Sequence, residues 1–461
     1  MIGGGHVGLV TAACLAAVGH RVRVQDIDRD RVDRLARGEL PFLEPDLAEL
    51  LAWGLANDRL SFHVDPESAV PPADVIFVCV DTPNREDGAV DLTALVAATR
   101  AAARHARPYA VLVNRSTAPV GTSAYAAAIA WEERSSPLSI TVNPEFLAEG
   151  TAVRDFLAPD RVVVGAWDRA EADRVLQVYR PILERRLPEP VPLHIRQRAD
   201  ASGEPVPALV MDPPTAELTK YAANAFLAVK ISFINEIASI SEEIGADVVQ
   251  VARAIGLDRR VGPHFLRAGV GWGGSCFPKD IVALQGMAET RGLAARMLQA
   301  AHEVNREQHR WVVRQLQRHL RTLVGRRIAL LGLSFKPETD DLRNAPALDI
   351  ALELTRLNAR VRAFDPVVKE LPAGLAGTIE MMESPEALAE GAEAIVLVTE
   401  WSQFAELDWP ALRRRMRTPL LLDGRNVIDP EAARAAGFTY VGVGRAGTEP
   451  GSFREIEASS A

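Results

Sequence analysis

Cysteine is scarce in this chain, and the three cysteines, Cys14, Cys79 and Cys276, lie far apart in its 461 residues. Three scattered cysteines cannot build a disulfide framework, and no Cys-x-x-Cys or His-Glu-x-x-His pattern indicates a metal site. We therefore expect a reducing, cytoplasmic setting and no bound metal. Cys14 and Cys79 are expected to be small core residues.

An excess of positive charge is also missing. The chain has 52 lysines and arginines against 61 acids, a net charge of −9, and no block of basic residues that could follow a nucleic-acid backbone. The N-terminus lacks the basic region and cleavage site of a signal peptide, and no later apolar run is long enough to span a bilayer. We expect neither a nucleic acid nor a membrane as partner.

A glycine fingerprint opens the chain. Gly3, Gly5 and Gly8 fit the pattern G-x-G-x-x-G and run into an alanine-rich helical stretch, Leu9–Val18, which is followed by an alternating strand ending at Asp26. A dinucleotide requires this order, because the helix N-terminus takes the pyrophosphate and the carboxylate binds the ribose diol while repelling a 2′-phosphate. The pattern predicts NAD as the cofactor rather than NADP.

The first strand of this predicted domain is unusually short. Only Met1 and Ile2 precede the fingerprint, whereas a strand normally has about five or six residues. We expect either a start upstream of Met1 or a domain without most of its central strand. A chain extended by a short apolar strand should then bind NAD more tightly and melt at a higher temperature.

Two apolar runs further on predict buried parallel strands. Asp74–Val80 is followed by Thr82, and Tyr109–Val113 is followed by Ser116 and Thr117. Ligands of open α/β sheets lie beyond the carboxyl ends of the strands, so we expect these hydroxyls where cofactor and substrate meet. Capping of the next helix is an equally good interpretation.

Two acids follow the next predicted strand, Ser139–Val142. Glu145 and Glu149 lie four residues apart and would share one face of a helix. Surface acids with this spacing are usually solvated, but their position after a strand end leaves a general-base role open.

A strong helical pattern begins at Thr215. Its polar face carries Lys220 and Asn224 one turn apart, so both can address one ligand. Such a lysine can stabilise an oxyanion, although an exposed lysine is the more common case. A second helical region is expected over residues 280–323, where His302, Glu303 and His309 lack ligand spacing and are expected on a solvated face.

The stretch from Gly269 to Asp280 sets Cys276 among glycines and beside two ionisable groups. Its glycines let a ligand approach the backbone closely. The ammonium of Lys279 would lower the pKa of the thiol and so raise the fraction of nucleophilic thiolate. The alternative is a glycine-rich turn with a structural cysteine.

The last third restarts an α/β pattern, with strands expected at Arg327–Leu331, Arg360–Phe364 and Ala394–Thr399. Its glycine fingerprint is degraded, and the nearby Lys336 and Arg343 suit a nucleoside diphosphate. The predicted fold is therefore α/β, with two doubly wound Rossmann-like domains joined by helices. The expected divisions are an NAD domain (1–187), an exposed loop (188–214), a central helical domain (215–323), a nucleotide-sugar domain (324–445) and a disordered tail (446–461).

With these residues in view, the chain resembles the UDP-glucose/GDP-mannose dehydrogenase family over almost its whole length, and most of all its UDP-glucose-oxidising branch. The resemblance rests on motifs in a fixed order, namely Gly3–Gly8, Ser116–Thr122, Asn143–Gly150, Pro159–Arg161, Lys220 with Asn224, Gly273–Asp280, Phe335–Pro337 and Asp340–Arg343. Two features depart from the family pattern. Asp81 stands where a small residue is usual, and the loop around residues 187–207 is longer than expected.

The resemblance implies oxidation of a sugar C6 alcohol to a carboxylate by two hydride transfers to NAD. Cys276 would hold the aldehyde as a thiohemiacetal and then as a thioester. The other implied catalytic roles are oxyanion stabilisation by Lys220 and Asn224, proton transfer through a water by Asp280, activation of the hydrolytic water by Glu145, and orientation of that water by Thr117.

The resemblance also implies the binding residues. Near NAD it places Thr82, Ser116, Glu149, Lys279 and Arg343, and near the nucleotide sugar it places Phe146, Leu147, Lys220, Asn224, Arg260, Phe265, Gly273, Lys336 and Arg425. Arg260 would reach into a partner subunit's site, which implies a homodimer or a higher homo-oligomer. GDP-mannose or a UDP-N-acetylhexosamine as the substrate, or a non-catalytic nucleotide-sugar-binding protein, are the alternatives.

Overall fold

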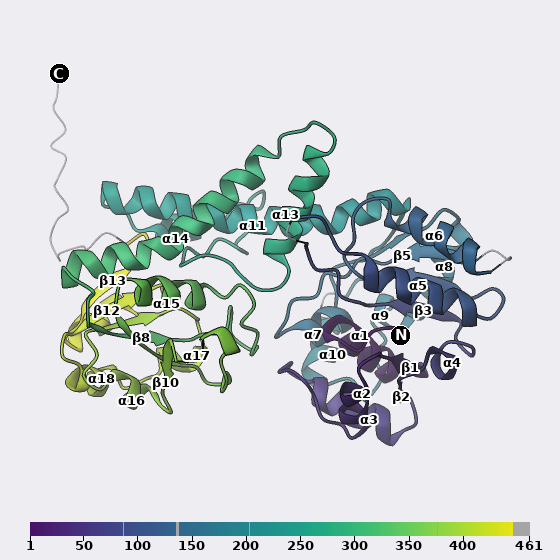
Figure 1. Ribbon diagram of the computed structural model, residues 1–461, viewed down its shortest axis with the longest axis horizontal. Helices are drawn as coiled ribbons and strands as arrows, with labels where there is room; N and C mark the ends of the chain where they lie inside the picture. The colour runs from purple at the N-terminus through teal and green to yellow at the C-terminus, as the bar shows by residue number, and fades with distance from the viewer. Residues whose placement is uncertain (86, 135–137, 202, 376, 446–461) are drawn as a thin grey trace. The chain divides into compact units, whose positions relative to one another are not determined.

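The computed structural model describes residues 1–85, 87–134, 138–201, 203–375 and 377–445. The chain forms two compact units (Figure 1). Unit 1 comprises Met1–Asn224 and Lys279–Ala294, and unit 2 comprises Ala225–Pro278 and the chain from Ala295 onward. The tail expected at 446–461 lies outside the described residues. The predicted domain boundaries stay predictions.

Unit 1 is built mainly on parallel strands. Its strands are β1 (Val22–Gln25), β2 (Leu60–His63), β3 (Val75–Val78), β4 (Val111–Asn114), β5 (Ser139–Val142), β6 (Val162–Gly165) and β7 (Ala208–Met211). Of these, β1, β3, β4 and β5 were predicted from the sequence and β2, β6 and β7 were not. β1 pairs with β2, and β3 to β7 form a five-stranded sheet in sequence order. Only the contact between β5 and β6 is antiparallel among these named strands.

Ile2 joins the two sets of strands. It forms parallel bridges to both Gln25 and Val78. Its N–H donates to the carbonyl of Phe77 at 2.8 Å, and its own carbonyl accepts from the N–H of Cys79 at 2.8 Å. The short segment before the fingerprint therefore stands in the central position, between β1 and β3, and the glycine turn begins at the carboxyl end of this position.

The helices of unit 1 cover this sheet (Figure 1). They are α1 (His6–Ala17), α2 (Arg29–Ala36), α3 (Leu47–Ala56), α4 (Pro66–Ala69), α5 (Thr93–His105), α6 (Thr122–Glu133), α7 (Ala152–Leu157), α8 (Arg169–Val178), α9 (Arg180–Leu183) and α10 (Leu193–Asp200). Ten residues of α1 are buried, which agrees with its alanine-rich sequence because a helix apolar on all sides belongs in a core. Cys14 and Cys79 are buried as expected.

The prediction of an exposed loop at 188–214 is wrong. This segment contains α10 and β7, and β7 pairs in parallel with β6. Ile195 and Ala199 lie one turn apart on α10 and are buried, so they give this helix an apolar face. Prolines and charged residues around this short pattern obscured it.

The helix α11 (Pro213–Ile244) confirms the helical pattern that begins near Thr215 and runs for 32 residues. Among the described residues it is the one helix long and apolar enough to cross a membrane, with a mean hydropathy of 1.3 over 18 residues. By length and composition alone, the expectation that no segment is long enough to span a bilayer was therefore wrong. A core helix of a soluble protein meets the same criterion.

Unit 2 contains a complete doubly wound sheet. Its strands are β8 (Arg327–Leu331), β9 (Arg360–Phe364), β10 (Ile379–Met381), β11 (Ala394–Leu397), β12 (Leu420–Asp423) and β13 (Thr439–Gly442), all parallel, in the order β10-β9-β8-β11-β12-β13. The chain direction around the sheet reverses between β8 and β11. Ligands of such sheets bind beyond the strand ends at this reversal.

The remaining helices are α12 (Val248–Gly256), α13 (Phe277–Glu289), α14 (Arg296–Leu320), α15 (Pro346–Arg356), α16 (Pro385–Ala389), α17 (Ser402–Ala405), α18 (Trp409–Arg415) and α19 (Pro430–Ala435). The single helical region expected over 280–323 is instead divided between α13 and α14. Gly292 separates them with φ of +72°, a left-handed conformation that ends a helix readily because glycine has no Cβ.

Candidate active site

The three fingerprint glycines of unit 1 meet three different requirements of a dinucleotide site. Gly3 has φ of +100°, and a Cβ there would lie 2.2 Å from the carbonyl oxygen of Cys79. A Cβ on Gly8 would lie 2.0 Å from the carbonyl oxygen of Gly3, whereas a Cβ on Gly5 would meet nothing within 4 Å. The first and third glycines thus allow the tight turn and close helix packing, and the second leaves space for a pyrophosphate.

The N-terminus of α1 and Asp26 complete this cofactor site. Gly5 caps α1 without a side-chain hydrogen bond, and the first turn holds no acid, so the N–H groups at the positive end of the helix can serve a phosphate. Asp26 is buried at the end of β1. Its Oδ2 accepts hydrogen bonds from the N–H of Gly4 at 2.7 Å and from Nη1 of Arg31 at 3.0 Å. These residues fit NAD; Arg31 was not predicted.

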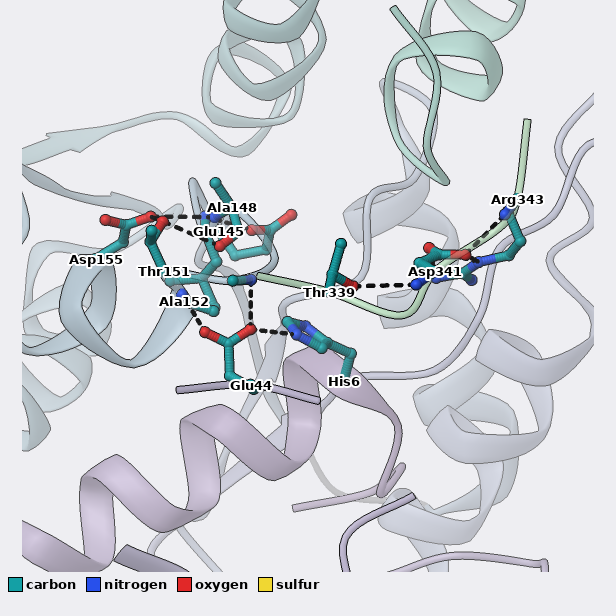
Figure 2. Close-up of polar contacts among 12 residues, drawn as sticks. His6, Glu44, Glu145, Ala148, Thr151, Ala152, Asp155, Thr339, Asp341 and Arg343 are labelled. Carbon is teal, nitrogen blue, oxygen red and sulfur yellow. Dashed lines mark hydrogen bonds and ion pairs between the residues drawn. The ribbon is translucent and has the colours of Figure 1, made fainter. Parts of the chain in front are cut away.

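Glu44 links the glycine turn to the loop that follows β5, as Figure 2 shows. Its buried carboxylate lies 2.9 Å from Nε2 of His6 and accepts from the N–H groups of Gly150 at 2.8 Å and Ala152 at 2.7 Å. Sequence reasoning missed Glu44 because His6 is 38 residues away from it and Gly150 and Ala152 are more than one hundred residues away.

The segment 143–150 is a loop, so the expectation that Glu145 and Glu149 share a helix face is wrong. Glu145 is buried, and its Oε2 accepts from the N–H of Leu147 at 2.7 Å. The ring of Phe146 stacks under the guanidinium of Arg161, 3.7 Å from the ring centroid. The two acids therefore have different environments, and Glu149 is only half-buried.

Lys220 lies on the buried face of α11 and forms an ion pair with Glu145. Its Nζ lies 2.7 Å from Oε1 of Glu145. Burial alone would raise the pKa of Glu145, but the charge and hydrogen bond of Lys220, with Arg115 and the N–H of Leu147, outweigh burial and lower that pKa. Glu145 is therefore a carboxylate at neutral pH. Lys220 is 4% exposed, so it is not an exposed lysine.

Asn224, one turn after Lys220, contacts the third predicted catalytic group. Its Nδ2 donates to Oδ2 of Asp280 at 2.6 Å, and Nζ of Lys279 donates to Oδ1 of Asp280 at 2.6 Å. Asp280 is 1% exposed. A buried carboxylate needs such partners, since leaving it unpaired is costly. In unit 1, α11 thus presents an ammonium and an amide beside two buried carboxylates.

The hydroxyls at the ends of β3 and β4 hold the two strand ends together. Ser116 Oγ donates to the carbonyl of Val80 at 2.8 Å and accepts from its N–H at 2.9 Å, while Thr82 Oγ1 donates to the carbonyl of Thr117 at 2.6 Å. Ser116 and Thr117 line a small pocket together with Lys220. Asp81, which departs from the family pattern, is exposed.

Glu217 is a buried residue of this region to which we assigned no role from the sequence. It lies on α11 and accepts hydrogen bonds from the N–H groups of Gly121 at 2.7 Å and Ser123 at 2.8 Å. A carboxylate at the start of α6 compensates the unpaired N–H groups of that helix. Glu217 thereby fixes the loop that carries Thr117.

The glycine loop before α13 is held tightly within unit 2. Gly271 and Gly274 have φ of +103° and +85°, and a Cβ on Gly273 would lie 2.0 Å from the carbonyl oxygen of Asn344. Nη1 of Arg425 donates to the carbonyl of Gly271 at 2.9 Å. Cys276 directly precedes α13 and is half-buried. The loop is a rigid support for a thiol that is not sealed in the core.

The other predicted substrate residues of unit 2 have local partners. Phe265 adopts φ of +62° and is 41% exposed. Nζ of Lys336 lies 5.5 Å from the centroid of the Phe335 ring. Two arginines pair with nearby acids: Arg343 with Asp341 at 2.7 Å (Figure 2) and Arg260 with Asp258 at 2.6 Å.

The second Rossmann-like sheet also uses a buried acid to hold the turn after its first strand, as Asp26 does in unit 1. Asp365, at the end of β9, is buried and accepts from the N–H groups of Leu333 at 2.8 Å and Ser334 at 3.1 Å. This carboxylate holds the turn after β8, where Gly332 has φ of +94°. In the described part of the chain, no three His, Cys, Asp or Glu side chains cluster as metal ligands.

Matches to known proteins cover nearly the whole chain. Three models of the UDP-glucose/GDP-mannose dehydrogenase family match, the NAD binding domain at residues 1–183, the central domain at 214–307 and the UDP binding domain at 329–430. A UDP-glucose 6-dehydrogenase of Pseudomonas aeruginosa is 42% identical over 96% of this chain and 97% of its own length.

Solved structures agree with the sequence matches. A UDP-glucose dehydrogenase from the archaeon Pyrobaculum islandicum superposes with a TM-score of 0.86 at 38% identity, covering 96% of this chain and 97% of its own. A UDP-D-ManNAc dehydrogenase from Pyrococcus horikoshii has a TM-score of 0.82 at 26% identity, covering 96% and 98%. The chain therefore belongs to the UDP-glucose/GDP-mannose dehydrogenase family.

Proposed function

We propose that this protein oxidises UDP-glucose to UDP-glucuronate with NAD as the cofactor. The observation that carries the proposal is the pair of buried contacts from α11, Lys220 with Glu145 and Asn224 with Asp280. Lys220 and Asn224, one helical turn apart, supply oxyanion donors, and Glu145 and Asp280 supply the bases beside them. Higher identity to UDP-glucose dehydrogenases than to the UDP-D-ManNAc enzyme favours UDP-glucose over the other nucleotide sugars.

NAD, when bound, accepts a hydride from C6 of the sugar in each of the two oxidation steps. The residues that would hold it are the fingerprint glycines and the N-terminus of α1 at the pyrophosphate, and Asp26 at the ribose diol. Further proposed cofactor contacts are Thr82, Ser116, Glu149, Lys279 and Arg343.

Cys276 is the proposed nucleophile. Its thiolate adds to the C6 aldehyde, a C–S bond forms, and the carbonyl oxygen becomes an oxyanion that Lys220 and Asn224 stabilise. After the second oxidation the adduct is a thioester. Water then attacks the thioester carbon, the C–S bond breaks, and the carboxylate leaves with the thiol restored. Asp280 serves proton transfer, and Glu145 with Thr117 activates and orients the water.

The ion pair between Lys220 and Glu145 suggests how one carboxylate could change its basicity during the cycle. While Lys220 is paired with Glu145, the pKa of Glu145 is lowered and the carboxylate is a weak base. A substrate oxyanion competes for the same ammonium. When Lys220 turns to the oxyanion, burial of Glu145 is less compensated, so its pKa rises and it becomes a better base for the hydrolytic water.

The nucleotide-sugar contacts are proposed at Phe146, Leu147, Phe265, Gly273, Lys336 and Arg425. Arg260 is proposed to act in a partner subunit's site, because its side chain is 89% exposed and lies beyond α12.

The side chains of Phe226, Phe233, Ile240 and Ile244 form an exposed apolar stripe on α11. Covering this stripe with a second copy supports a homodimer. The scattered cysteines support a cytoplasmic location.

Turnover with a panel of nucleotide sugars tests the function. NADH formation is measured at 340 nm with UDP-glucose, GDP-mannose, UDP-N-acetylglucosamine and UDP-N-acetylmannosamine. The proposal predicts the highest kcat/KM with UDP-glucose. A preference for another sugar would transfer the same chemistry to that substrate, and no NADH with any of them would favour a non-catalytic nucleotide-sugar-binding protein.

A further inference from the structure

A second pocket lies in unit 2 beside the glycine loop. It has a volume of about 350 Å³ and is lined by α14, α15 and loop residues that include Trp272. Figure 1 shows α14 and α15 side by side along this unit. The volume falls in the range of small-molecule sites, about 300 to 1,000 Å³. None of Phe265, Lys336 and Arg425 lines it, so it is not the set of residues proposed for the nucleotide sugar.

Three guanidinium groups line the pocket. Arg306 and Arg310 come from α14, and Arg356 comes from the end of α15. Among the residues that the structure describes, none of the three has a hydrogen bond or an ion pair. The lining also contains two acids, but one of them, Asp349, lies 3.3 Å from Nδ1 of His309. The pocket thus holds more positive than negative charge, and its arginines have donors to spare for a ligand.

The same pocket is in contact with the backbone of the glycine loop. Asn305 accepts from the N–H of Trp272 at 2.7 Å and donates to its carbonyl at 2.9 Å. The indole of Trp272 meets the ring of His302 edge to face, with centroids 6.2 Å apart. Nε2 of His309 is buried without a partner in the described structure. His302 and His309, which were expected on a solvated face, are half-buried and line this pocket.

We propose that this pocket is a regulatory site for an anion carrying two or more phosphate groups. Guanidinium groups match phosphate oxygens with paired, charge-assisted hydrogen bonds, and three of them on two helices suit more than one phosphate. A bound anion would draw α14 and α15 together around the charges. Asn305 and His302 contact Trp272, so this movement of α14 reaches the glycine loop. It changes how rigidly the loop that carries Cys276 is held. The binding of the anion does not depend on the proposed function, whereas its effect on turnover rests on that function.

Calorimetry of the full chain with inorganic pyrophosphate tests the binding step. UDP and NAD are present at saturation, so that both nucleotide sites are filled, and sodium chloride of equal ionic strength is the reference. We expect one site per chain. The double variant Arg306→Gln/Arg310→Gln should bind pyrophosphate at least tenfold more weakly, because it loses two charged donors. Arg314→Gln, an exposed arginine on α14 outside the lining, should bind like the wild type.

Three results would overturn the site: no heat beyond that of sodium chloride, unchanged binding by the double variant, or pyrophosphate binding that appears only when UDP is omitted. The regulatory part is tested by NADH formation with and without pyrophosphate. We expect a change in kcat or KM in the wild type and in Arg314→Gln that the double variant lacks. Binding without any change in rate would contradict regulation. No NADH from the wild type would count against the proposed function and would leave the calorimetric result intact.

Discussion

Nζ of Lys220 lies 2.7 Å from Oε1 of Glu145, and both side chains are buried. The pair joins α11 to the loop after β5. Removing the ammonium alone leaves a buried carboxylate without its main partner, which typically costs about 3–5 kcal/mol. We expect Lys220→Ala to lower the free energy of unfolding in urea by this order. Lys220→Ala/Glu145→Gln should recover part of the loss, since the amide carries no charge. Equal stability of the single and double variants would contradict the ion pair.

The same pair predicts a pH dependence. The pKa of Glu145 is lowered in the folded chain, so its carboxylate adds stability above the unfolded pKa of about 4.3. That stability is lost as pH falls through the lower, folded pKa. The difference in unfolding free energy between the wild type and Glu145→Gln should therefore be largest near neutral pH and shrink below pH ~4. If the difference in unfolding free energy instead grew as the pH fell, the pKa of Glu145 would be raised in the folded chain rather than lowered.

Lys220→Ala should also slow the reaction. Loss of one oxyanion donor typically lowers kcat by about 10²–10³, and we expect the fall mainly in kcat. Steady-state kinetics at a temperature where the variant is folded measures this. A change confined to KM would assign Lys220 to substrate binding alone.

The fingerprint offers a matched pair of glycine variants. Gly3→Ala puts a Cβ 2.2 Å from the carbonyl oxygen of Cys79 at a left-handed φ, so the melting temperature should fall. Gly5→Ala meets no atom within 4 Å. It should keep the melting temperature but weaken NAD binding, because its methyl group occupies the space expected for the pyrophosphate. Calorimetry and NAD titration distinguish the two; unchanged NAD affinity of Gly5→Ala would place the pyrophosphate elsewhere.

Cofactor selectivity should depend on Asp26. Its carboxylate would face the 2′-phosphate of NADP and repel it, so kcat/KM with NADP should be far below that with NAD. Asp26→Asn should narrow this gap, and Arg31, 3.0 Å from Asp26, would then be available to a phosphate. Comparable kcat/KM for both cofactors in the wild type would refute the assignment.

Cys276→Ser should abolish overall turnover and keep nucleotide binding, because a hydroxyl is a much weaker nucleophile than a partly ionised thiol at neutral pH. Retention of most of the steady-state rate by Cys276→Ser would return this residue to a structural role.

The strands were predictable because buried parallel strands are continuous apolar runs, as at Val111–Asn114 and Ala394–Leu397. The fingerprint and Lys220 with Asn224 were predictable for a similar reason, since short spacings fix their geometry. Long-range contacts were not. Glu44 meets Gly150, and Glu217 meets Ser123, across about one hundred residues, and no local pattern encodes these pairs. The helix α10 was missed because it is only eight residues long, too short for a clear helical repeat of apolar residues.

The most direct test of the account is the number of NADH molecules formed per UDP-glucose consumed. Limiting UDP-glucose is incubated with excess NAD until the absorbance at 340 nm stops rising, and the sugar products are separated by chromatography. A thiol that retains the aldehyde between the two oxidations predicts two NADH per sugar, with UDP-glucuronate as the product. One NADH per sugar, with free UDP-glucose aldehyde in solution, would contradict the thioester route through Cys276.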